Sequence, residues 1–430
     1  MRRDITLYWC GQTTSAFGSV FTAVALPVIA ILHLGASPGQ MGLIGAASTV
    51  PGLVAGLPAG ALADRITRPR RTLLALDTVS ALGVALLALG VANRVATIGW
   101  LVCLGVLEGC LSVLAGSLYF VHLRQLVDSA GASDGGIGPV RARLQAGQYG
   151  AALLGRILAG PVIVTFGSPA ALAIDAASYL LSATALLGMK APDRAPATAA
   201  DRDSGGGFRR AVSGLRFFAT HRYQRALLVF IVVPAAAMTG VGTLTGPFLL
   251  RVIHLPTAYY GLAFVLAGAT GLAGSMAAGR VLAPHRDPRR LTILAFGCGM
   301  TCCLLLPLAA GPLLLAAGCA ALGIGLPVFF GAIANVAVSS VLTADVEEGE
   351  MGRVSAALQL VLGLAAMLGA LAGGMLGDRL GIRPALWTLC AVSLAAAALA
   401  GPQALRSARS AHLGPVTVPA AVAEVSGRPS

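Results

Sequence analysis

Long apolar stretches separated by short polar segments dominate the chain. Twelve of these stretches have about the 20 residues that a helix needs to cross the hydrocarbon core of a bilayer. They are continuous, whereas the strands of a membrane barrel alternate apolar and polar residues. The pattern predicts an all-α membrane protein with twelve transmembrane helices. The expected spans are Leu7–Leu32, Gly42–Ala63, Leu73–Val91, Ile98–Phe120, Leu144–Phe166, Pro169–Met189, Ala226–Leu250, Tyr259–Gly279, Leu291–Ala310, Leu313–Leu342, Val354–Leu376 and Pro384–Gly401.

Composition supports this class. Of the 430 residues, 57% are hydrophobic and only 11% are charged, against about 25% charged residues in ordinary soluble domains. A soluble enzyme and a disordered chain are both excluded. The net charge of +13 is explained by basic loops that orient membrane helices, so we expect no nucleic-acid partner. The eight cysteines lie within apolar stretches without a histidine cluster, so we expect no disulfide, no metal and no cofactor.

The basic residues orient the spans. With the N-terminus in the cytoplasm, 25 of the 30 basic residues fall on the cytoplasmic side, four lie outside, and Arg156 alone lies within a span. This asymmetry predicts that both termini are cytoplasmic. The start of the chain is expected to be an uncleaved first helix. The lysine-poor, Ala- and Gly-rich composition is typical of GC-rich bacterial genomes, so we expect a multi-pass protein of a bacterial inner membrane.

The chain divides into four expected regions. Residues 1–189 and 226–402 form two six-helix bundles, and residues 403–430 form a disordered cytoplasmic tail. Residues 190–225 form a central cytoplasmic loop. The loop begins as a flexible linker, and Phe208–Arg225 then has the spacing of an interfacial amphipathic helix. An extension of the seventh span explains that spacing equally well.

The two bundles repeat one another. The glycines and basic residues around positions 52–71 recur around positions 271–290, and the segment 155–160 recurs as 369–374. The repeat predicts two halves in parallel orientation. Transporters that rock two bundles around a site near the midplane have this organisation. Small residues at four-residue spacing also predict close packing between helix backbones.

A motif after the second span resembles the loop signature of the major facilitator superfamily. Its residues are Gly60, Asp64, Arg65, Arg68, Arg70 and Arg71, with Thr67 in place of the usual second glycine. The resemblance implies the superfamily's twelve-helix fold. It also implies that Asp64 and the arginines form a cytoplasmic charge network that steadies the outward-facing state. The alternative is that the arginines only anchor the topology.

A second motif, in the fifth span, resembles the Gly-Pro-x-x-Gly-Gly signature of drug antiporters. Gly155 and Gly160 match it, whereas Arg156 replaces the proline and Ala159 replaces the first of the paired glycines. Other segments resemble the drug- and siderophore-exporter branch that includes macrolide efflux proteins. This resemblance implies export of a drug, an antibiotic or a natural product in exchange for protons. The further segments are Ser15–Gly18, Ala25–Pro27, Leu73–Asp77, Asp175–Ser178 and Gly352–Ser355.

Four charged residues lie inside spans, namely Asp77, Glu108, Arg156 and Asp175. Intramembrane charges are expensive, so each is a candidate functional residue. Glu108 and Arg156 both lie about 15 Å below the outer face. We therefore expect them to pair at the substrate cavity, with Asp175 as an outer alternative partner. Arg156 cannot lose its proton, so Glu108 is the member expected to titrate. A purely structural ion pair is the alternative.

Uncharged polar residues could line the same cavity, and the candidates are Gln148, Asn335 and Gln359 together with Gln12, Thr13, Thr14 and Tyr149. A few polar groups in an apolar pocket suit an amphipathic molecule. We therefore expect a secondary active transporter, not an enzyme, that exports a hydrophobic or amphipathic small molecule by proton antiport. Its partners would be this substrate, protons and the lipid bilayer, and we expect a monomer. The alternatives are an importer or uniporter of a small metabolite on the same fold, and a membrane sensor without transport.

Overall fold

The computed structural model describes residues 2–129, 137–189, 216, 218, 222–281, 287–346 and 351–412. Throughout these residues the chain is helical, apart from short connections. The helices are α1 (Arg2–Val28) with the π-helical η1 (Ile29–His33), α2 (Pro38–Arg65), α3 (Pro69–Ala92), α4 (Ile98–Ser129), α5 (Ile137–Phe166), α6 (Ser168–Leu187), α8 (Arg222–Pro247) with the π-helical η3 (Phe248–Val252), α9 (Thr257–Val281), α10 (Pro288–Cys302), α11 (Leu305–Leu308), α12 (Leu313–Asp345), α13 (Met351–Leu380) and α14 (Ile382–His412).

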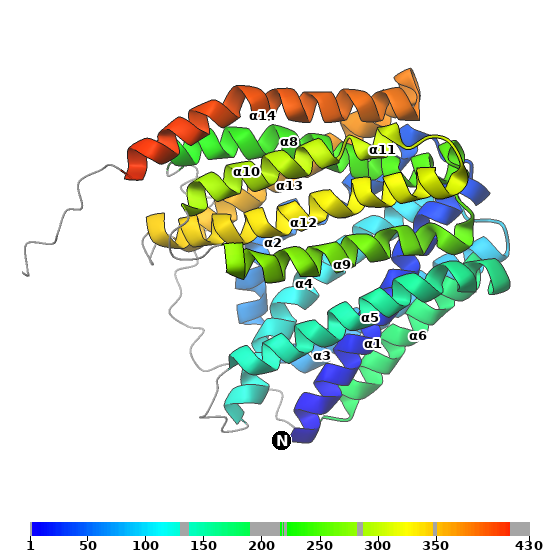
Figure 1. Ribbon diagram of the computed structural model, residues 1–430. Helices are drawn as coiled ribbons and strands as arrows, with labels where there is room; N and C mark the ends of the chain where they lie inside the picture. The colour runs from blue at the N-terminus through cyan, green and yellow to red at the C-terminus, as the bar shows by residue number, and fades with distance from the viewer. Residues whose placement is uncertain are drawn as a thin grey trace, which may run out of the picture.

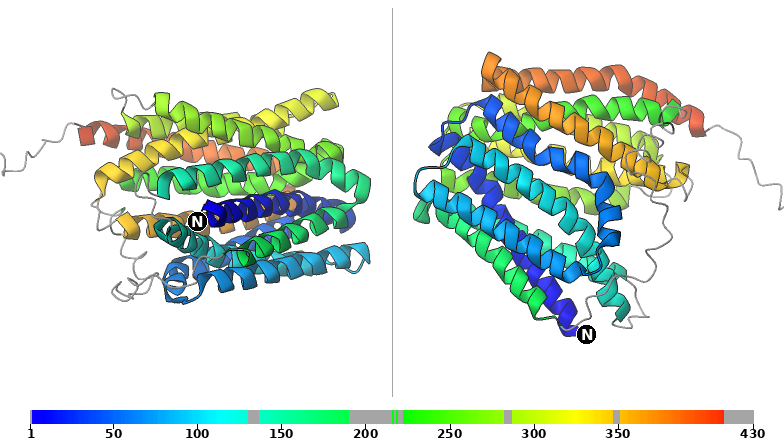
Figure 2. Two further views of the ribbon diagram at one scale, coloured as in Figure 1. Left: turned by 90° about the horizontal axis from the view of Figure 1, so that it is seen from below. Right: turned by 180° about the vertical axis from the view of Figure 1, so that it is seen from behind.

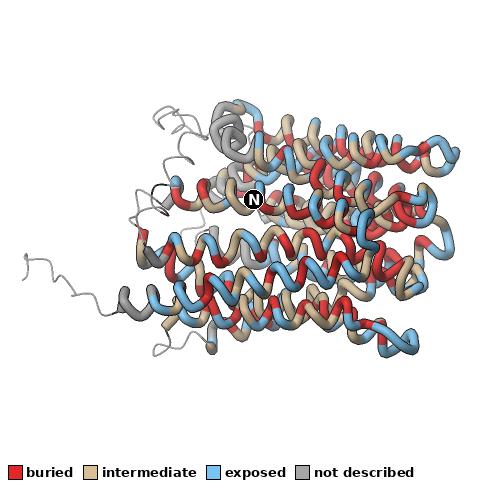
Figure 3. Tube along the Cα trace, turned by 90° about the horizontal axis from the view of Figure 1, so that it is seen from above, coloured by how far each residue is buried: buried red, intermediate tan, exposed pale blue. Residues whose placement is uncertain are grey.

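Eleven helices in this part of the chain are long and apolar enough to cross a membrane. The remaining predicted span, Gly42–Ala63, is helical within α2, but the structure describes its side chains only through Val54. Exposed leucines and valines cover the helices from end to end, including Leu314 and Leu399. Figure 3 accordingly shows exposed positions along the full length of the helices rather than only at their ends. Such a surface fits a lipid environment, because lipid removes the usual need to bury apolar residues.

Structural features recur at positions that the sequence repeat relates. Pro69 and its counterpart Pro288 both occupy the first position of a helix, where a proline costs no hydrogen bond. Gly167 and its counterpart Gly381 both have a positive φ, of 85° and 89°. Glycine adopts this left-handed conformation without steric penalty, so the two glycines end α5 and α13 and reverse the chain at equivalent points.

The two halves also share an unusual feature, a π-helical turn at the end of their first helix. In η1 the amide of Leu34 donates to the carbonyl of Ile29 at 3.0 Å, and in η3 the amide of Ile253 donates to that of Phe248 at 3.0 Å. A proline, Pro27 or Pro247, lies just before each turn. Because proline lacks the amide donor, it loosens the helix at that level.

The halves meet at one end of the molecule and separate at the other. Figure 1 shows the second half, α8 to α14, running across the top, while the first half tilts away towards the N-terminus. The rear view in Figure 2 shows the same divergence. Between the halves, α2 packs against α13, and α5 packs against α9. We refer to the end where α1 begins as the N-terminal side and to the closed end as the far side.

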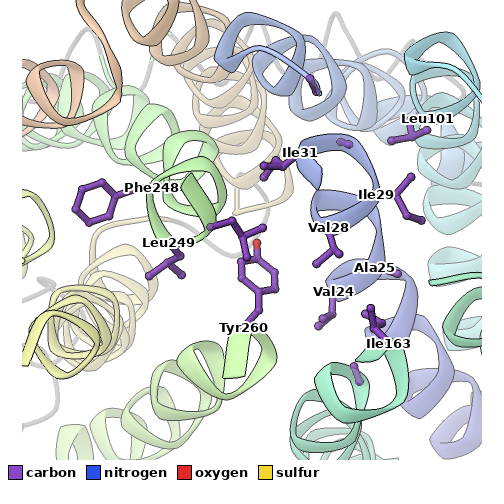
Figure 4. Close-up of a cluster of buried hydrophobic side chains, with 14 of the residues drawn as sticks. Val24, Ala25, Val28, Ile29, Ile31, Leu101, Ile163, Phe248, Leu249 and Tyr260 are labelled. Atoms are coloured by element: carbon purple, nitrogen blue, oxygen red, sulfur yellow. The ribbon is translucent and has the colours of Figure 1, made fainter. Parts of the chain in front are cut away.

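The largest buried cluster lies where the halves converge. Figure 4 shows Val28 and Ile31 from the first half near Phe248 and Leu249 from the second, with Tyr260 between them. Val28 and Ile31 are therefore buried against the second half, whereas Ile29 faces Leu101 of its own half and the ring of Phe248 lies 5.6 Å from the guanidinium of Arg383 in its own half. This cluster seals the far side of the molecule.

Some sequence predictions need refinement or correction. The ninth span is present as a single candidate span, Pro288–Leu308, in which two turn residues separate α10, ending at Cys302, from the short α11, beginning at Leu305. The tail predicted to be disordered from residue 403 continues α14 as far as His412. Most of the predicted amphipathic helix Phe208–Arg225 lies outside the described residues. Within it, Phe218 is buried against the ends of α12 and α13.

Candidate functional site

A cavity of about 400 Å³ lies between the two halves, just below the seal. Helices α1, α2, α8, α9 and α13 all contribute to its wall, which is mainly apolar. Polar groups come chiefly from Thr239, Thr243 and Tyr260. A second cavity of about 370 Å³ lies within the second half between α8, α10 and α12, and Gly242 borders both. The site therefore offers apolar volume with a few hydroxyl groups.

Two polar contacts between the halves hold the far side closed. The Arg251 guanidinium, through Nη2, donates to the carbonyl of Ile31 at 2.8 Å. The Ser37 hydroxyl donates to Asp378 Oδ2 at 3.2 Å. Both contacts must break before the cavity can open on this side.

Two glycine crossings bring the backbones of the halves together. At Gly42, an added Cβ would lie 2.6 Å from the carbonyl oxygen of Ala370. At the repeat-related crossing, a Cβ on Gly261 would collide with the carbonyl of Arg156. Only glycine permits such close approach, so these positions set the distance between the halves.

The antiporter-like segment has a packing role at both of its glycines. A Cβ at Gly155 would lie 2.9 Å from the carbonyl of Phe17, within the same half. A Cβ at Gly160 would collide with the backbone of Ala258 on α9, in the other half. The two glycines therefore fasten α5 to α1 on one face and to α9 on the other.

Arg156 lies between these glycines and reaches across to the second half. Its Nη1 atom lies 3.0 Å from where a Cβ at Gly268 would be. The side chain is partly exposed. The predicted pair with Glu108 is absent, although the structure describes both residues. The prediction failed because helical depth fixes the level of a side chain but leaves open which neighbour it faces.

Glu108 instead joins a hydroxyl network inside the first half. Ser80 on α3 and Tyr179 on α6 each donate to its Oε2 atom at 3.2 Å. Ser19 on α1 donates in turn to the Tyr179 hydroxyl at 3.3 Å. The second carboxylate oxygen, Oε1, is buried without a hydrogen-bond partner among the described atoms.

Asp175 is buried in the seam between α1 and α6. Thr22 donates to its Oδ2 at 2.5 Å, and Ser178 donates to its Oδ1 at 3.3 Å. A Cβ at Gly18 would collide with Ser178, so the two helices must be close here. Hydrogen bonds of this kind offset the cost of burying a carboxylate.

Asp77 is buried nearer the N-terminal side. The Tyr119 hydroxyl lies 3.0 Å from Oδ1 and 3.1 Å from Oδ2 of Asp77. Tyr8 donates to the backbone carbonyl of Tyr119 at 3.0 Å. Asp77, Glu108 and Asp175 thus form a series of carboxyl groups where α1, α3, α4 and α6 meet. Sequence analysis found the acids but missed Tyr119 and Tyr179, whose only signal was a tyrosine in an apolar span.

The other predicted site residues lie apart from this network. Gln148 Nε2 donates to Gln12 Oε1 at 3.4 Å, which links α5 to α1. Asn335 and Gln359 are exposed, and neither is among the residues that line the central cavity.

The gate motif is described in part. The structure gives no side-chain detail for Gly60, Asp64 or Arg65. Arg68 and Arg71 are exposed, and Arg70 Nη2 donates to the carbonyl of Leu187 at 2.7 Å. In the second half, the equivalent region has an ion pair between Arg289 and Asp345 at 2.5 Å. Across the described residues, no group of three or more metal-ligating side chains comes together.

Two repeated helical bundles around a central cavity are the architecture of a membrane transporter. Comparisons with known proteins agree with this. The profile of the Major Facilitator Superfamily matches residues 8–344. The chain therefore belongs to the major facilitator superfamily and is a transporter rather than an enzyme. No curated protein matches the sequence.

Several solved structures share the fold at low sequence identity. A mutant of the nucleoside transporter NupG has a TM-score of 0.75 at 11% identity, covering 93% of this chain and 98% of its own. A bacterial homologue of the iron transporter ferroportin, in an inward-facing state, has a TM-score of 0.68 at 15% identity, with coverages of 95% and 99%. A bacterial homologue of the human lysosomal transporter Spinster, inward-facing and unoccupied, has a TM-score of 0.63 at 15% identity, with coverages of 95% and 97%.

Proposed function

We propose that the protein exports a hydrophobic or amphipathic small molecule in exchange for protons, by alternating access. The observation that carries the proposal is the apolar cavity between halves that are sealed at the far side and separated at the other. Apolar walls with a few hydroxyl groups favour an amphipathic organic molecule over a sugar or an ion. The adjoining cavity in the second half extends the apolar volume available to it.

The basic residues support an inward-facing assignment for this conformation. They concentrate at the N-terminal side, which the positive-inside rule assigns to the cytoplasm. Two structures with the same fold are themselves inward-facing. In this state the cavity would receive a substrate from the cytoplasm, as an exporter requires.

Glu108 is the carboxyl group that we assign to proton coupling. Its Oε2 atom is held by two hydroxyl groups, while its Oε1 atom lacks a partner among the described atoms. Asp175, in contrast, has a hydroxyl group near each carboxylate oxygen: Thr22 donates to Oδ2, and the Ser178 hydroxyl, which also donates to the Asp175 backbone carbonyl at 2.8 Å, lies 3.3 Å from Oδ1. Proton binding at Glu108 would change hydrogen bonds that span α3, α4 and α6. A proton can drive transport only by favouring one conformation in this way.

The test measures dye efflux from an efflux-deficient bacterial host, with and without a pH gradient, for a panel of fluorescent lipophilic dyes. Wild-type protein should exclude at least one dye in a gradient-dependent manner. Glu108→Gln should lose the dependence on the gradient but keep exchange at zero gradient. Asp175→Asn is the matched comparison and should keep the dependence of efflux on the pH gradient.

The outcomes separate the alternatives. If Glu108→Gln retains full gradient-driven efflux and Asp175→Asn loses it, the coupling group is Asp175. If both variants retain it, the coupling group is neither Glu108 nor Asp175, and Asp77, the third carboxyl of the series, is the remaining candidate; wild-type efflux that does not depend on the gradient would refute proton antiport. Accumulation of a compound inside cells, instead of its exclusion, would favour the importer or uniporter.

The loop motif is proposed as the cytoplasmic gate. Asp64 is the only acid beside four arginines there, so its loss should weaken the outward-facing state. Asp64→Asn should insert normally in the membrane and transport slowly. Wild-type efflux from a well-expressed Asp64→Asn variant would remove the gate assignment.

A further inference from the structure

Arg156 occupies a position whose counterpart in the second half lines the central cavity. The repeat relates Arg156 to Ala370, and both contribute the carbonyl at a glycine crossing between the halves. The side chain of Ala370 borders the cavity. By the repeat, Arg156 is the position on the opposite crossing that matches this cavity-lining residue, although in this conformation Arg156 itself is not among the residues that line the cavity.

The contacts of Arg156 agree with this placement. Its guanidinium lies against Gly268 on α9, one helical turn from Phe264, which lines the cavity. A Cβ at Gly268 would lie 3.0 Å from Nη1, so the glycine leaves the room that the guanidinium occupies. The charge thus lies between α5 and α9, two helices that belong to different halves, one turn of α9 away from a residue that lines the cavity.

No acidic side chain compensates this charge within the described residues. Glu108 and Asp175 are bound to hydroxyl groups in the first half, and the structure gives Arg156 no ion pair and no side-chain hydrogen bond. The side chain is partly exposed in this conformation, so water can solvate it. When the halves close around the cavity, that water is lost, and an uncompensated guanidinium is then expensive.

We propose that Arg156 binds the anionic group of an amphipathic substrate whose apolar body fills the central cavity. This inference rests on the proposed transport function and adds the charge class of the substrate. A carboxylate, sulfonate or phosphate group can accept two parallel hydrogen bonds from a guanidinium. The bound anion replaces the water that closure removes, so an anionic substrate permits closure and a cationic one opposes it.

The experiment compares three probes that share one ring system, namely naphthalene-1-acetate, its neutral amide and the cationic 1-naphthylmethylamine. Binding to the full-length protein in phosphatidylcholine nanodiscs is measured as ligand-induced thermal stabilisation, which rises with affinity. The variants are Arg156→Gln and Arg156→Lys. The matched control is Arg379→Gln, which removes one exposed positive charge from α13, the repeat counterpart of α5.

Wild type should bind the acid more tightly than the amide, and the amine least. Arg156→Gln should weaken binding of the acid by roughly tenfold to a hundredfold, the range for a hydrogen bond to a charged group, and leave the amide unchanged. Arg156→Lys should keep part of the preference for the acid, and Arg379→Gln should keep all of it. Nanodiscs with added phosphatidylglycerol test the source of the anion: suppression of acid binding there would identify a lipid headgroup as the occupant.

Three results would overturn the assignment. An acid-over-amide preference that survives in Arg156→Gln would show that another group binds the anion. Binding of the amide and the amine by wild type without preference for the acid would leave the transport proposal intact and remove this inference. If wild type binds none of the three probes, the anion-binding assignment fails, and the transport proposal is decided separately by the dye-efflux measurement.

Discussion

Gly42→Ala tests whether the glycine crossings control the conformational equilibrium. The added methyl group would lie 2.6 Å from the Ala370 carbonyl oxygen and 3.2 Å from Gly374 Cα, whereas ordinary contacts are 3.4–4 Å. The two backbones must therefore separate by about 0.8 Å, and overpacking of this kind costs about 1–3 kcal/mol. The cost applies only while α2 and α13 are in contact. The far-side-closed state should thus lose about 5- to 150-fold in population relative to the alternative.

Amide hydrogen exchange measures this change directly. Residues 34–42 and 374–381 should exchange faster in Gly42→Ala, and Gly261→Ala should have the corresponding effect at the other crossing. Gly52→Ala is the matched control, because a Cβ there meets nothing within 4 Å while both substitutions gain about the same helix propensity. If these residues exchange at the same rate in Gly42→Ala and Gly52→Ala, the contact between α2 and α13 at Gly42 does not control the conformational equilibrium.

Three further predictions concern individual contacts. Thr22→Val removes a hydroxyl donor from the buried Asp175 carboxylate and should reduce stability by about 1.5–3 kcal/mol, measured by thermal unfolding; an unchanged melting temperature would mean that water replaces the hydroxyl. Arg251→Gln should accelerate amide exchange in η1, because its hydrogen bond to the Ile31 carbonyl across the far side is lost; unaltered exchange would show that this contact does not hold the far side closed. Arg289→Gln should lower stability by no more than about 1 kcal/mol, since its pair with Asp345 is partly exposed; a larger loss would reveal a wider network.

The sequence predicted the fold well because its signals are long and redundant. Twelve apolar stretches, their basic connections and the internal repeat each constrain the same topology. The repeated segments 155–160 and 369–374 illustrate this agreement, since they lie in α5 and α13, which end at the equivalent positive-φ glycines Gly167 and Gly381. The two turn residues between α10 and α11 have no signal of their own in the sequence, because the apolar pattern of this span continues through them.

The site was harder to predict, for a physical reason. Sequence position gives the depth of Glu108 and Arg156 in the membrane, but the direction of each side chain depends on helix rotation and on neighbours. The hydroxyl partners of Glu108 come from α3 and α6, which are distant in the sequence. Ser80 and Tyr179 are ordinary residues in apolar spans, and the sequence around each gives no signal that its hydroxyl contacts a carboxylate.

The carboxyl series has a consequence for energy efficiency. Asp77, Glu108 and Asp175 are all held within the first half, whereas the walls of the cavity come from both halves. On our proposal, the driving ion and the cargo therefore share no binding atoms and communicate only through the rocking of rigid bundles. Because the proton and the cargo do not compete for the same atoms, nothing prevents the conformational change when only one of the two sites is occupied. We therefore expect a variable ratio of protons to cargo, with some protons crossing the membrane without cargo transport when the cargo concentration is low.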